Sequence, residues 1–360
     1  MTWNLLNFSE NATDRAPYMR TVLDSMKPEL LAVQEIAGEA GAHFFRDQVL
    51  QGTMAMAPFQ PGPNTNNALF YDSLLFSSVS MTVIPTALRD INQYTLRHLN
   101  SGDTLHIFSV HLKSSSGAAN ETLRKAEVDS LRRVTNALPP ESYFIVCGDF
   151  NFYGSNDLAY SRLLQQDGTN GYFIDPIAYS GTWNTEEYAI HHTQSPRSRS
   201  FGGGASGGLD DRFDLILFSH SFGPNGAIRY EYNTSWAVGN DGQHYNDSIN
   251  HPPNLSVSQN IANALHYASD HLPVVTSFKF YNTLSITAYG SKGQVLAYPN
   301  PTDGKLTIEL QQAVKSVDVT ITDAYGKRVS THSFLNAKVF NLNITGHTGV
   351  YSIQLTTETV

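Results

Sequence analysis

Polar side chains stand at the ends of several short apolar runs, at positions that a hydrophobic core would not select. One acidic residue after a strand is more often a turn or a helix cap, but a whole set of such residues is hard to explain in that way. Phosphodiester hydrolysis needs a hard cation, an activated water and hydrogen-bond donors for the transition state, and side chains of these types can supply all three. The residues are Asn4, Glu35, His111, Asp149, Asn151, Asp214, Asp270 and His271.

The residue types divide into chemical roles. Glu35 and Asp270 are hard oxygen ligands that suit Mg²⁺, Mn²⁺ or Ca²⁺, and the sequence has no His/Cys cluster of the zinc type. Asp149 can polarise a water, and Asn151, two residues further on, lies on the same side of an extended segment and can donate to a phosphoryl oxygen. The two histidines can donate protons or hydrogen bonds, and Asp214 can hold one of them in a single tautomer.

Short strands alternating with helices must bring these side chains together. Apolar residues recur at helical spacing before Pro28, and residues 104–113 alternate between two faces as a half-buried strand does. Alternating strands and helices predict α/β or α+β architecture. We expect a glycine-rich flexible loop within 185–209 and a long polar insert at 220–268 with a short helix near Ile261 and Leu265. The expected strands are 2–7, 30–34, 104–113, 143–147, 214–219 and 273–280, and the expected helices are 14–26 and one around Val128 to Leu138.

The order of the motifs is more specific than any one of them. The series resembles that of the endonuclease/exonuclease/phosphatase superfamily, which includes pancreatic-type deoxyribonucleases, abasic-site endonucleases, neutral sphingomyelinases and inositol polyphosphate phosphatases. The resemblance covers residues 1 to about 280. It consists of Trp3-Asn4, Gln34-Glu35, Gly148-Asp149-Phe150-Asn151, Arg212-Phe213-Asp214 and Ser269-Asp270-His271.

The resemblance implies an α+β fold, a four-layer sandwich of two packed mixed sheets with outer helices. It also implies a divalent cation, Mg²⁺ or alternatively Mn²⁺ or Ca²⁺. Leu6 departs from the pattern, because abasic endonucleases place an Asp there, and this weakens a two-metal proposal. Carried over motif by motif, the implied metal ligands are Asn4, Glu35 and Asp270, and the implied catalytic residues are His111, Asp149, Asn151, Asp214 and His271.

Three further residues are candidates for substrate binding. Lys113 shares a strand face with His111, although a solvated lysine would give the same pattern. His192 lies in a region between two motifs that often approaches substrate, although a loop histidine is as easily a surface residue. Arg212 belongs to the motif that ends in Asp214. Cys147 is interpreted as a core residue, because its strand is apolar throughout.

The character of the chain changes after residue 281. We expect a catalytic domain at 1–281, a linker at 282–294 and a small all-β Ig-like sandwich at 295–360, because apolar residues there alternate at period two between turn signals. The segment Val295 to Gly304, VLAYPNPTDG, resembles the start of the C-terminal sorting domain of type IX secretion in Bacteroidetes. That resemblance implies the type IX machinery as a partner; the alternative is an accessory Ig-like or carbohydrate-binding module.

Composition limits the other properties. The chain has 360 residues, 41% of them hydrophobic and 15% charged, with a net charge of −9. We expect a folded monomer without a membrane span, since no apolar run approaches the roughly 20 residues that a span needs. The N-terminus lacks the features of a signal peptide. Because the tail indicates export, we expect a secreted or cell-surface protein whose leader once preceded Met1.

These observations favour an extracellular nuclease that hydrolyses DNA or RNA. The alternative within enzymes is a phosphatase or a sphingomyelinase-like phosphodiesterase acting on small phosphoesters or head groups. Acidity mildly favours that alternative, and the sequence shows no aromatic-and-basic stripe typical of a strand-binding groove. A non-catalytic binding protein is a third hypothesis, but it has no need for every member of the polar set.

Overall fold

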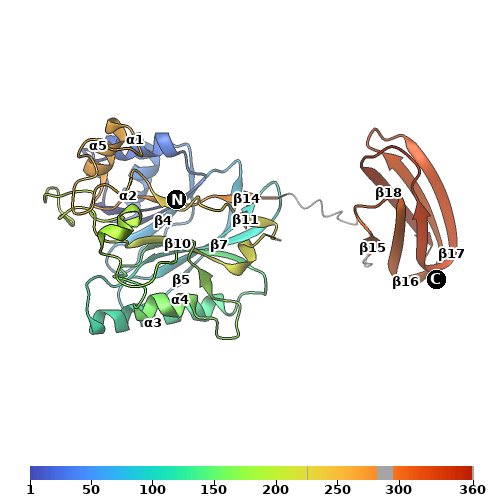
Figure 1. The fold of residues 1–360 in the computed structure, drawn as a ribbon, viewed down its shortest axis with the longest axis horizontal. Helices are drawn as coiled ribbons and strands as arrows, with labels where there is room; N and C mark the ends of the chain where they lie inside the picture. Colours follow the sequence, from blue (N-terminus) through green and yellow to red (C-terminus); the bar gives the residue numbers. More distant parts are fainter. Residues whose placement is uncertain (225, 282–294, 359–360) are drawn as a thin grey trace. The chain divides into compact units, whose positions relative to one another are not determined.

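The structure is a computed structural model that describes residues 1–224, 226–281 and 295–358. The chain folds into two compact units, Met1–Leu284 and Ser285–Val360 (Figure 1). The predicted linker, 282–294, lies outside the described residues. No helix in the described part of the chain is long and apolar enough to cross a membrane.

Two mixed β-sheets form the centre of the larger unit, and each has six strands. The first has the order β12 (Trp236–Ala237), β13 (Val274–Val275), β1 (Thr2–Phe8), β2 (Leu30–Ile36), β4 (Asn66–Tyr71) and β3 (Ala55–Met56). The second has the order β5 (Phe76–Ile84), β6 (Ile91–His98), β7 (Thr104–His111), β8 (Tyr143–Asp149), β10 (Asp214–Ser219) and β9 (Phe173–Ile174). A separate ribbon pairs β11 (Ile228–Tyr230) with β14 (Phe278–Phe280).

Helices cover the outer faces of the sheets, so the unit has four layers (Figure 1). One buried cluster joins the first sheet to α1 and α5, a second joins the other sheet to α3 and α4, and a third fills the space between the sheets. Cys147 belongs to the third cluster, as expected. The helices are α1 (Ala16–Met26), α2 (Glu39–Phe44), η1 (Phe45–Val49), α3 (Ala118–Thr135), α4 (Leu158–Leu164), η2 (Glu186–His191), η3 (His220–Phe222) and α5 (Gln259–Ala268).

Strand register gathers the predicted polar residues at one end of the sheets. Asp149, the last residue of β8, pairs with His111 of parallel β7 on one side and with Asp214 of antiparallel β10 on the other. In the first sheet, Asn4 of β1 pairs with Gln34 of parallel β2. Polar residues of neighbouring strands therefore lie side by side in each sheet.

The four-layer α+β fold is confirmed, and most predicted elements lie within a few residues of their expected positions. One predicted strand is wrong. Residues 273–280 split into β13, which pairs with β1, and β14, which pairs with β11, because residues 276 and 277 leave the first sheet between them. Within the predicted loop at 185–209, η2 occupies the first part.

The smaller unit is all-β, as predicted. A register shift in β16 between Glu309 and Val314 divides that strand, and its first half pairs with β15 while its second half pairs with β18. Side chains from both halves share one buried core. The strands are β15 (Val295–Tyr298), β16 (Lys305–Asp323), β17 (Arg328–Asn343) and β18 (Tyr351–Glu358).

Candidate active site

His271 and Asp214 form a buried pair. His271 Nδ1 donates to Asp214 Oδ2 at 2.7 Å, and His271 is only 3% exposed. Burial alone would lower the pKa of His271, but the carboxylates of Asp214, Asp270 and Asp149 raise it well above its usual value. A protonated ring at this position can donate through Nε2, which lies 3.8 Å from Asp149 Oδ2.

Asp149 lies between the two histidines. His111 Nε2 is 3.5 Å from Asp149 Oδ2 and 3.8 Å from Glu35 Oε1. Burial, helped by Asp214 and Glu35, raises the pKa of Asp149 to about 7, although His271 and Asn4 act in the opposite direction. Burial, together with the positive charges of Arg89 and His271, lowers the pKa of His111 well below its usual value. Near neutral pH the site therefore pairs a neutral histidine with a carboxyl group poised to exchange a proton.

Asn4 connects the two sheets at this edge. Its side-chain nitrogen donates to Glu35 Oε1 and to Asp149 Oδ2, both at 3.1 Å, and its oxygen accepts from the Leu6 N–H at 3.0 Å. The Asn7 N–H donates to Glu35 Oε2 at 2.9 Å. Asn4 therefore fixes the positions of both carboxylates.

The backbone is strained where these side chains emerge. Glu35 and Asn151 have φ values of 59° and 55°, and Leu6 and Asn7 have 52° and 48°. Residues other than glycine rarely adopt positive φ, and such strain persists only where the surrounding structure enforces it. Here it accompanies a register shift between β1 and β2 and turns the Glu35 carboxylate toward Asn4.

Comparison with known proteins adds an independent observation. The model of the endonuclease/exonuclease/phosphatase family matches residues 1–271, which contain the whole cluster. The chain belongs to this family. The model of the secretion system C-terminal sorting domain matches residues 296–360. The large unit thus has the fold of a phosphoester hydrolase, and the small unit is a sorting tail for type IX secretion.

Solved structures share the fold at low sequence identity. D. rerio TDP2 complexed with a single-strand DNA product is 14% identical, with a TM-score of 0.51, and the match covers 77% of this chain and 97% of that one. The human Nocturnin catalytic domain is 19% identical, with a TM-score of 0.50 over 77% and 91% of the chains. A mannosyl-6-phosphatase from Bacteroides thetaiotaomicron is 14% identical, with a TM-score of 0.50 over 78% and 98%. No curated protein matches the chain.

Enzymes of the endonuclease/exonuclease/phosphatase family generally use divalent metals. Among the described residues, no three or more His, Cys, Asp or Glu side chains are grouped so that they could hold a metal ion. Glu35 is the most open carboxylate of the cluster, because its side chain is 16% exposed against 3% for Asp149 and 0% for Asp214. Mg²⁺ is commonly held by one or two carboxylates, with water and substrate oxygens completing its shell. Glu35 and the adjacent Asp149 fit that kind of site.

Asp270 and Asn151 have backbone partners. Asp270 Oδ2 accepts from the Ala205 N–H at 2.6 Å, while its buried Oδ1 has no partner among the described residues. The Asn151 side-chain nitrogen donates to the Leu112 carbonyl at 3.2 Å, and the Asn151 N–H donates to Asp149 Oδ1 at 3.1 Å. Asn151 retains one side-chain N–H that the Leu112 contact does not use.

The three candidates for substrate binding have other partners. Arg212 is buried against Asp175 through two hydrogen bonds of 2.9 Å, and His192 is fully buried with Nε2 donating to the Trp183 carbonyl at 2.7 Å. Lys113 Nζ donates to the Ser114 carbonyl at 2.6 Å. The structure does not bring Arg212 or His192 into the cluster around Asp149.

Two residues of this site were missed by the sequence analysis. Gln194 places its side-chain amide 2.5 Å from His271 Nε2. Thr193 Oγ1 accepts from the Phe213 N–H and the Asp214 N–H, both at 3.1 Å. Thr193 and Gln194 therefore connect the motif that contains Asp214 to the motif that contains His271. In the sequence, the position of Thr193 and Gln194 directly after His192 was the only indication of this role.

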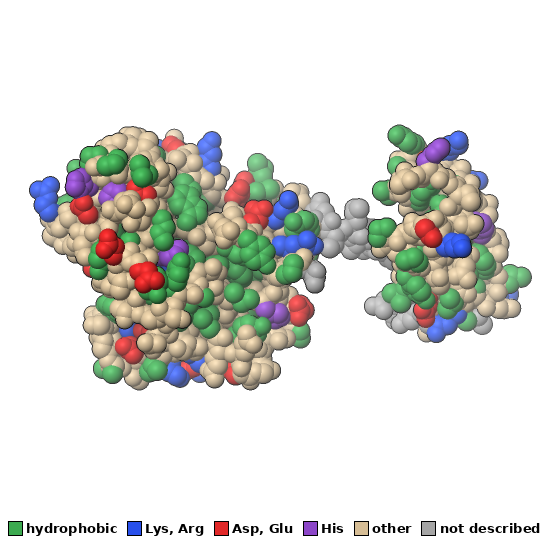
Figure 2. All heavy atoms as spheres, viewed as in Figure 1, with side chains coloured by type: hydrophobic (Ala, Val, Ile, Leu, Met, Phe, Trp, Pro, Cys, Tyr) green, Lys and Arg blue, Asp and Glu red, His purple; other side chains and the backbone are tan. Residues whose placement is uncertain are grey.

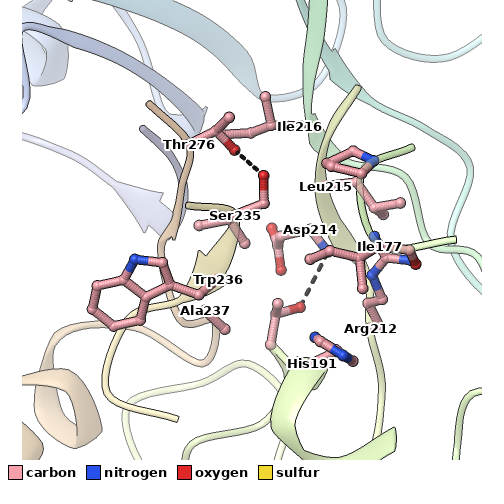
Figure 3. Close-up of a pocket in the computed structure, with 13 residues that line it drawn as sticks. Ile177, His191, Arg212, Asp214, Leu215, Ile216, Ser235, Trp236, Ala237 and Thr276 are labelled. Atoms are coloured by element: carbon pink, nitrogen blue, oxygen red, sulfur yellow. Dashed lines mark hydrogen bonds between the residues drawn. The ribbon is translucent and has the colours of Figure 1, made fainter. Parts of the chain in front are cut away.

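Asp214 also lines a small pocket of about 10 Å³ (Figure 3). Ser235, which is hydrogen bonded to Thr276 at 2.9 Å, and Trp236 lie on the opposite wall from His191 (Figure 3). This volume is about that of one water and far below that of a ligand pocket.

Proposed function

We propose that this protein is an exported, divalent-metal-dependent phosphodiesterase that cleaves DNA or RNA. One observation carries the proposal: Asp149 Oδ2 lies within 3.8 Å of two histidines whose pKa values are shifted in opposite directions. Groups with separated pKa values can take acid and base roles at the same pH. The secretion tail supports action outside the cell.

Each residue then has a defined task. Asp149, which the Asn4 amide holds beside Glu35, accepts a proton from the attacking water. His271, oriented by Asp214, donates to a phosphoryl oxygen and stabilises the charge that develops there. The free amide hydrogen of Asn151 serves as another donor, and neutral His111 orients the Asp149 carboxyl group.

Glu35 would hold the divalent cation beside Asp149. The cation supplies Lewis-acid stabilisation of the phosphoryl oxygens. Asn4, proposed from the sequence as a ligand, directs its nitrogen at the Glu35 carboxylate and is better placed to orient that group than to bind a cation. Asp270, also proposed as a ligand, has one oxygen bonded to the Ala205 N–H.

Hydrolysis of small phosphoesters is the second candidate. It is supported by the net charge of −9 and by the shared fold of the mannosyl-6-phosphatase. The face in Figure 2 shows scattered Lys and Arg side chains, with no broad basic surface among its described residues. Because the net charge is −9, strong non-catalytic binding to nucleic acid is not expected, and local contacts must select the substrate.

A substrate panel distinguishes the candidates. It comprises single-stranded DNA, plasmid DNA, RNA, bis-p-nitrophenyl phosphate, p-nitrophenyl phosphate and sphingomyelin, each with Mg²⁺, Mn²⁺, Ca²⁺ or EDTA. The proposal predicts cleavage of nucleic acid and of the small diester, loss of both activities in EDTA, and little turnover of the monoester. Turnover of the monoester alone would contradict a nuclease.

A further inference from the structure

The glycine-rich segment at 195–208 is a closed loop. Its ends are joined because the Ser195 N–H donates to the Gly208 carbonyl at 2.9 Å, and Gly208 and Gly207 both donate to the Arg197 carbonyl at 3.0 Å. Ser195 Oγ donates to the Ala205 carbonyl at 3.0 Å. The loop therefore has a defined path.

A buried arginine attaches this loop to helix α5. Arg197 is 1% exposed, and its guanidinium donates to the loop carbonyls of Phe201 at 3.4 Å and Gly203 at 3.3 Å. It also donates to the carbonyls of His266 at 2.9 Å and Tyr267 at 3.4 Å, in the last turn of α5. A cation at a helix C-terminus is favourable, so Arg197 joins the loop firmly to the end of α5.

Aromatic rings from three distant segments meet beside this loop and the end of α5. The Tyr267 ring lies 5.1 Å from that of Tyr18 in α1 and 5.7 Å from that of Phe201, and Phe201 lies 5.1 Å from His266. We call these four residues the aromatic patch. Tyr18 is 39% exposed and Tyr267 is 42% exposed, so part of the patch faces solvent. The sequence shows no aromatic stripe because these residues come together only in the fold.

The patch adjoins the candidate active site. The Ala205 N–H of the same loop donates to Asp270 Oδ2, and a Cβ on Gly204 would lie 2.5 Å from that oxygen. An extended chain spans at most about 3.6 Å per residue, so the backbones of Tyr267 and Asp270 are within roughly 11 Å. Asp270 directly precedes His271.

Positive charge also gathers here, although the protein is acidic overall. Burial lowers the pKa of His266, and the nearby charges of Arg197 and Arg199 act in the same direction, against the hydrogen bond that the ring makes to the Pro196 carbonyl. Arg15 donates to the carbonyl of Ala268 at 3.2 Å, just beyond Tyr267. Arg15 and Arg197 are bound to backbone carbonyls, so the exposed Arg199 is the guanidinium near the patch that nucleic acid can contact. Exposed rings with such a group close to a phosphodiester site are features that bind unstacked bases.

We propose that the aromatic patch binds a nucleobase of single-stranded nucleic acid whose phosphodiester lies in the active site. The proposal rests on the proposed function and narrows its substrate to single strands. Base stacking on aromatic side chains contributes about 1–3 kcal/mol per base. A duplex offers no free base faces, so it gains nothing from the patch.

Equilibrium binding tests this proposal without turnover. Fluorescence anisotropy would measure the affinity of the full chain for a labelled oligothymidylate and for a strand of equal length built from abasic residues, both in EDTA. Wild type should bind the oligothymidylate more tightly than it binds the abasic strand. Phe201→Leu/Tyr267→Leu keeps apolar volume but lacks the rings, and should weaken oligothymidylate binding by about 5- to 150-fold. Binding of the abasic strand should not change.

Tyr232→Ala is the matched control, because Tyr232 is 75% exposed and lies outside the patch. It should change neither affinity. Equal binding of the two strands by wild type, or an equal effect of the double variant on both, would overturn the proposal. If nucleic acid is bound through the patch but never cleaved, the proposed function fails and the patch stands. If DNA is cleaved but the two strands bind equally, the patch fails and the proposed function stands.

Discussion

The side-chain amide of Gln194 lies 2.5 Å from Nε2 of His271, on the ring edge opposite the Asp214 hydrogen bond. An amide can both donate and accept, so Gln194 can serve the neutral or the protonated ring. In the proposed mechanism, Nε2 is the atom that contacts the phosphoryl group. Gln194 therefore fixes the ring until substrate arrives.

Gln194→Leu should lower turnover. Without Gln194 the ring is no longer held where Nε2 meets the phosphoryl group, and misplacement of a catalytic group can cost up to about 10²-fold in rate. Steady-state kinetics on bis-p-nitrophenyl phosphate would measure the loss. Gln243→Leu, at an exposed position, is the control and should retain activity. Equal activity of the two variants would show that Gln194 does not position His271.

Asp211 should make stability depend on pH. Burial raises its pKa to about 7, Asp210 acts in the same direction, and Asn184 opposes them. An unfolded Asp titrates near about 3.9, so the folded state binds more protons between these values. Its stabilising contribution is present below the unfolded pKa and is lost as pH rises through about 7.

Asp211→Asn removes this effect. The melting temperature of the variant, relative to wild type, should be higher at pH 8 than at pH 4.5 by differential scanning fluorimetry. The exposed Asp24→Asn on α1 is the control and should shift the melting temperature equally at both pH values. An equal shift for Asp211→Asn would contradict the assignment.

Glu35→Gln should weaken metal dependence rather than abolish the fold. The substitution keeps the shape of the side chain but removes the charge that a cation needs. Titration of turnover with Mg²⁺ should show a higher half-saturating concentration and partial recovery at high metal. Glu39→Gln, in α2, should leave the titration unchanged. An unaltered Mg²⁺ response in Glu35→Gln would exclude Glu35 as the principal ligand.

The C-terminal unit should be dispensable for chemistry. The cluster lies within residues 1–271, and the two units have separate cores. A chain of residues 1–281 should fold, as judged by circular dichroism, and should hydrolyse the small diester at a rate near that of the full chain. A folded fragment without turnover would contradict the proposed domain division.

The sequence predicted the strands that carry Asp149 and Asp214. In each case an apolar run marks the strand, and a polar residue beside that run marks one end of it. Strand register then brought these residues side by side. Resemblance to the family supplied the order of the motifs. Local patterns could not reveal contacts such as that of Gln194 with His271, since those partners are 77 positions apart.

Arg212 shows another limit of sequence reasoning. A motif position suggested substrate binding, yet a guanidinium that folds into the interior requires a counter-charge, and Asp175 supplies it. Nothing near Arg212 in the sequence indicates that partner. The closed loop was missed for the same reason, because its order comes from Arg197 and Asp270 and not from its glycines.

In the proposed mechanism, Asp149 and His271 perform the hydrolysis. Kinetics on bis-p-nitrophenyl phosphate across a Mg²⁺ titration would test it in Asp149→Ala and His271→Ala, with folding checked by circular dichroism. Loss of a positioned acid or base costs about 10²–10⁴ in rate, so each variant should lose at least about a hundredfold in kcat. Lys113→Ala should lose less, because Lys113 contacts a backbone carbonyl outside the cluster. A similar loss in His111→Ala would add His111 to the reacting groups. Near wild-type turnover in well-folded Asp149→Ala and His271→Ala would contradict the proposed active site.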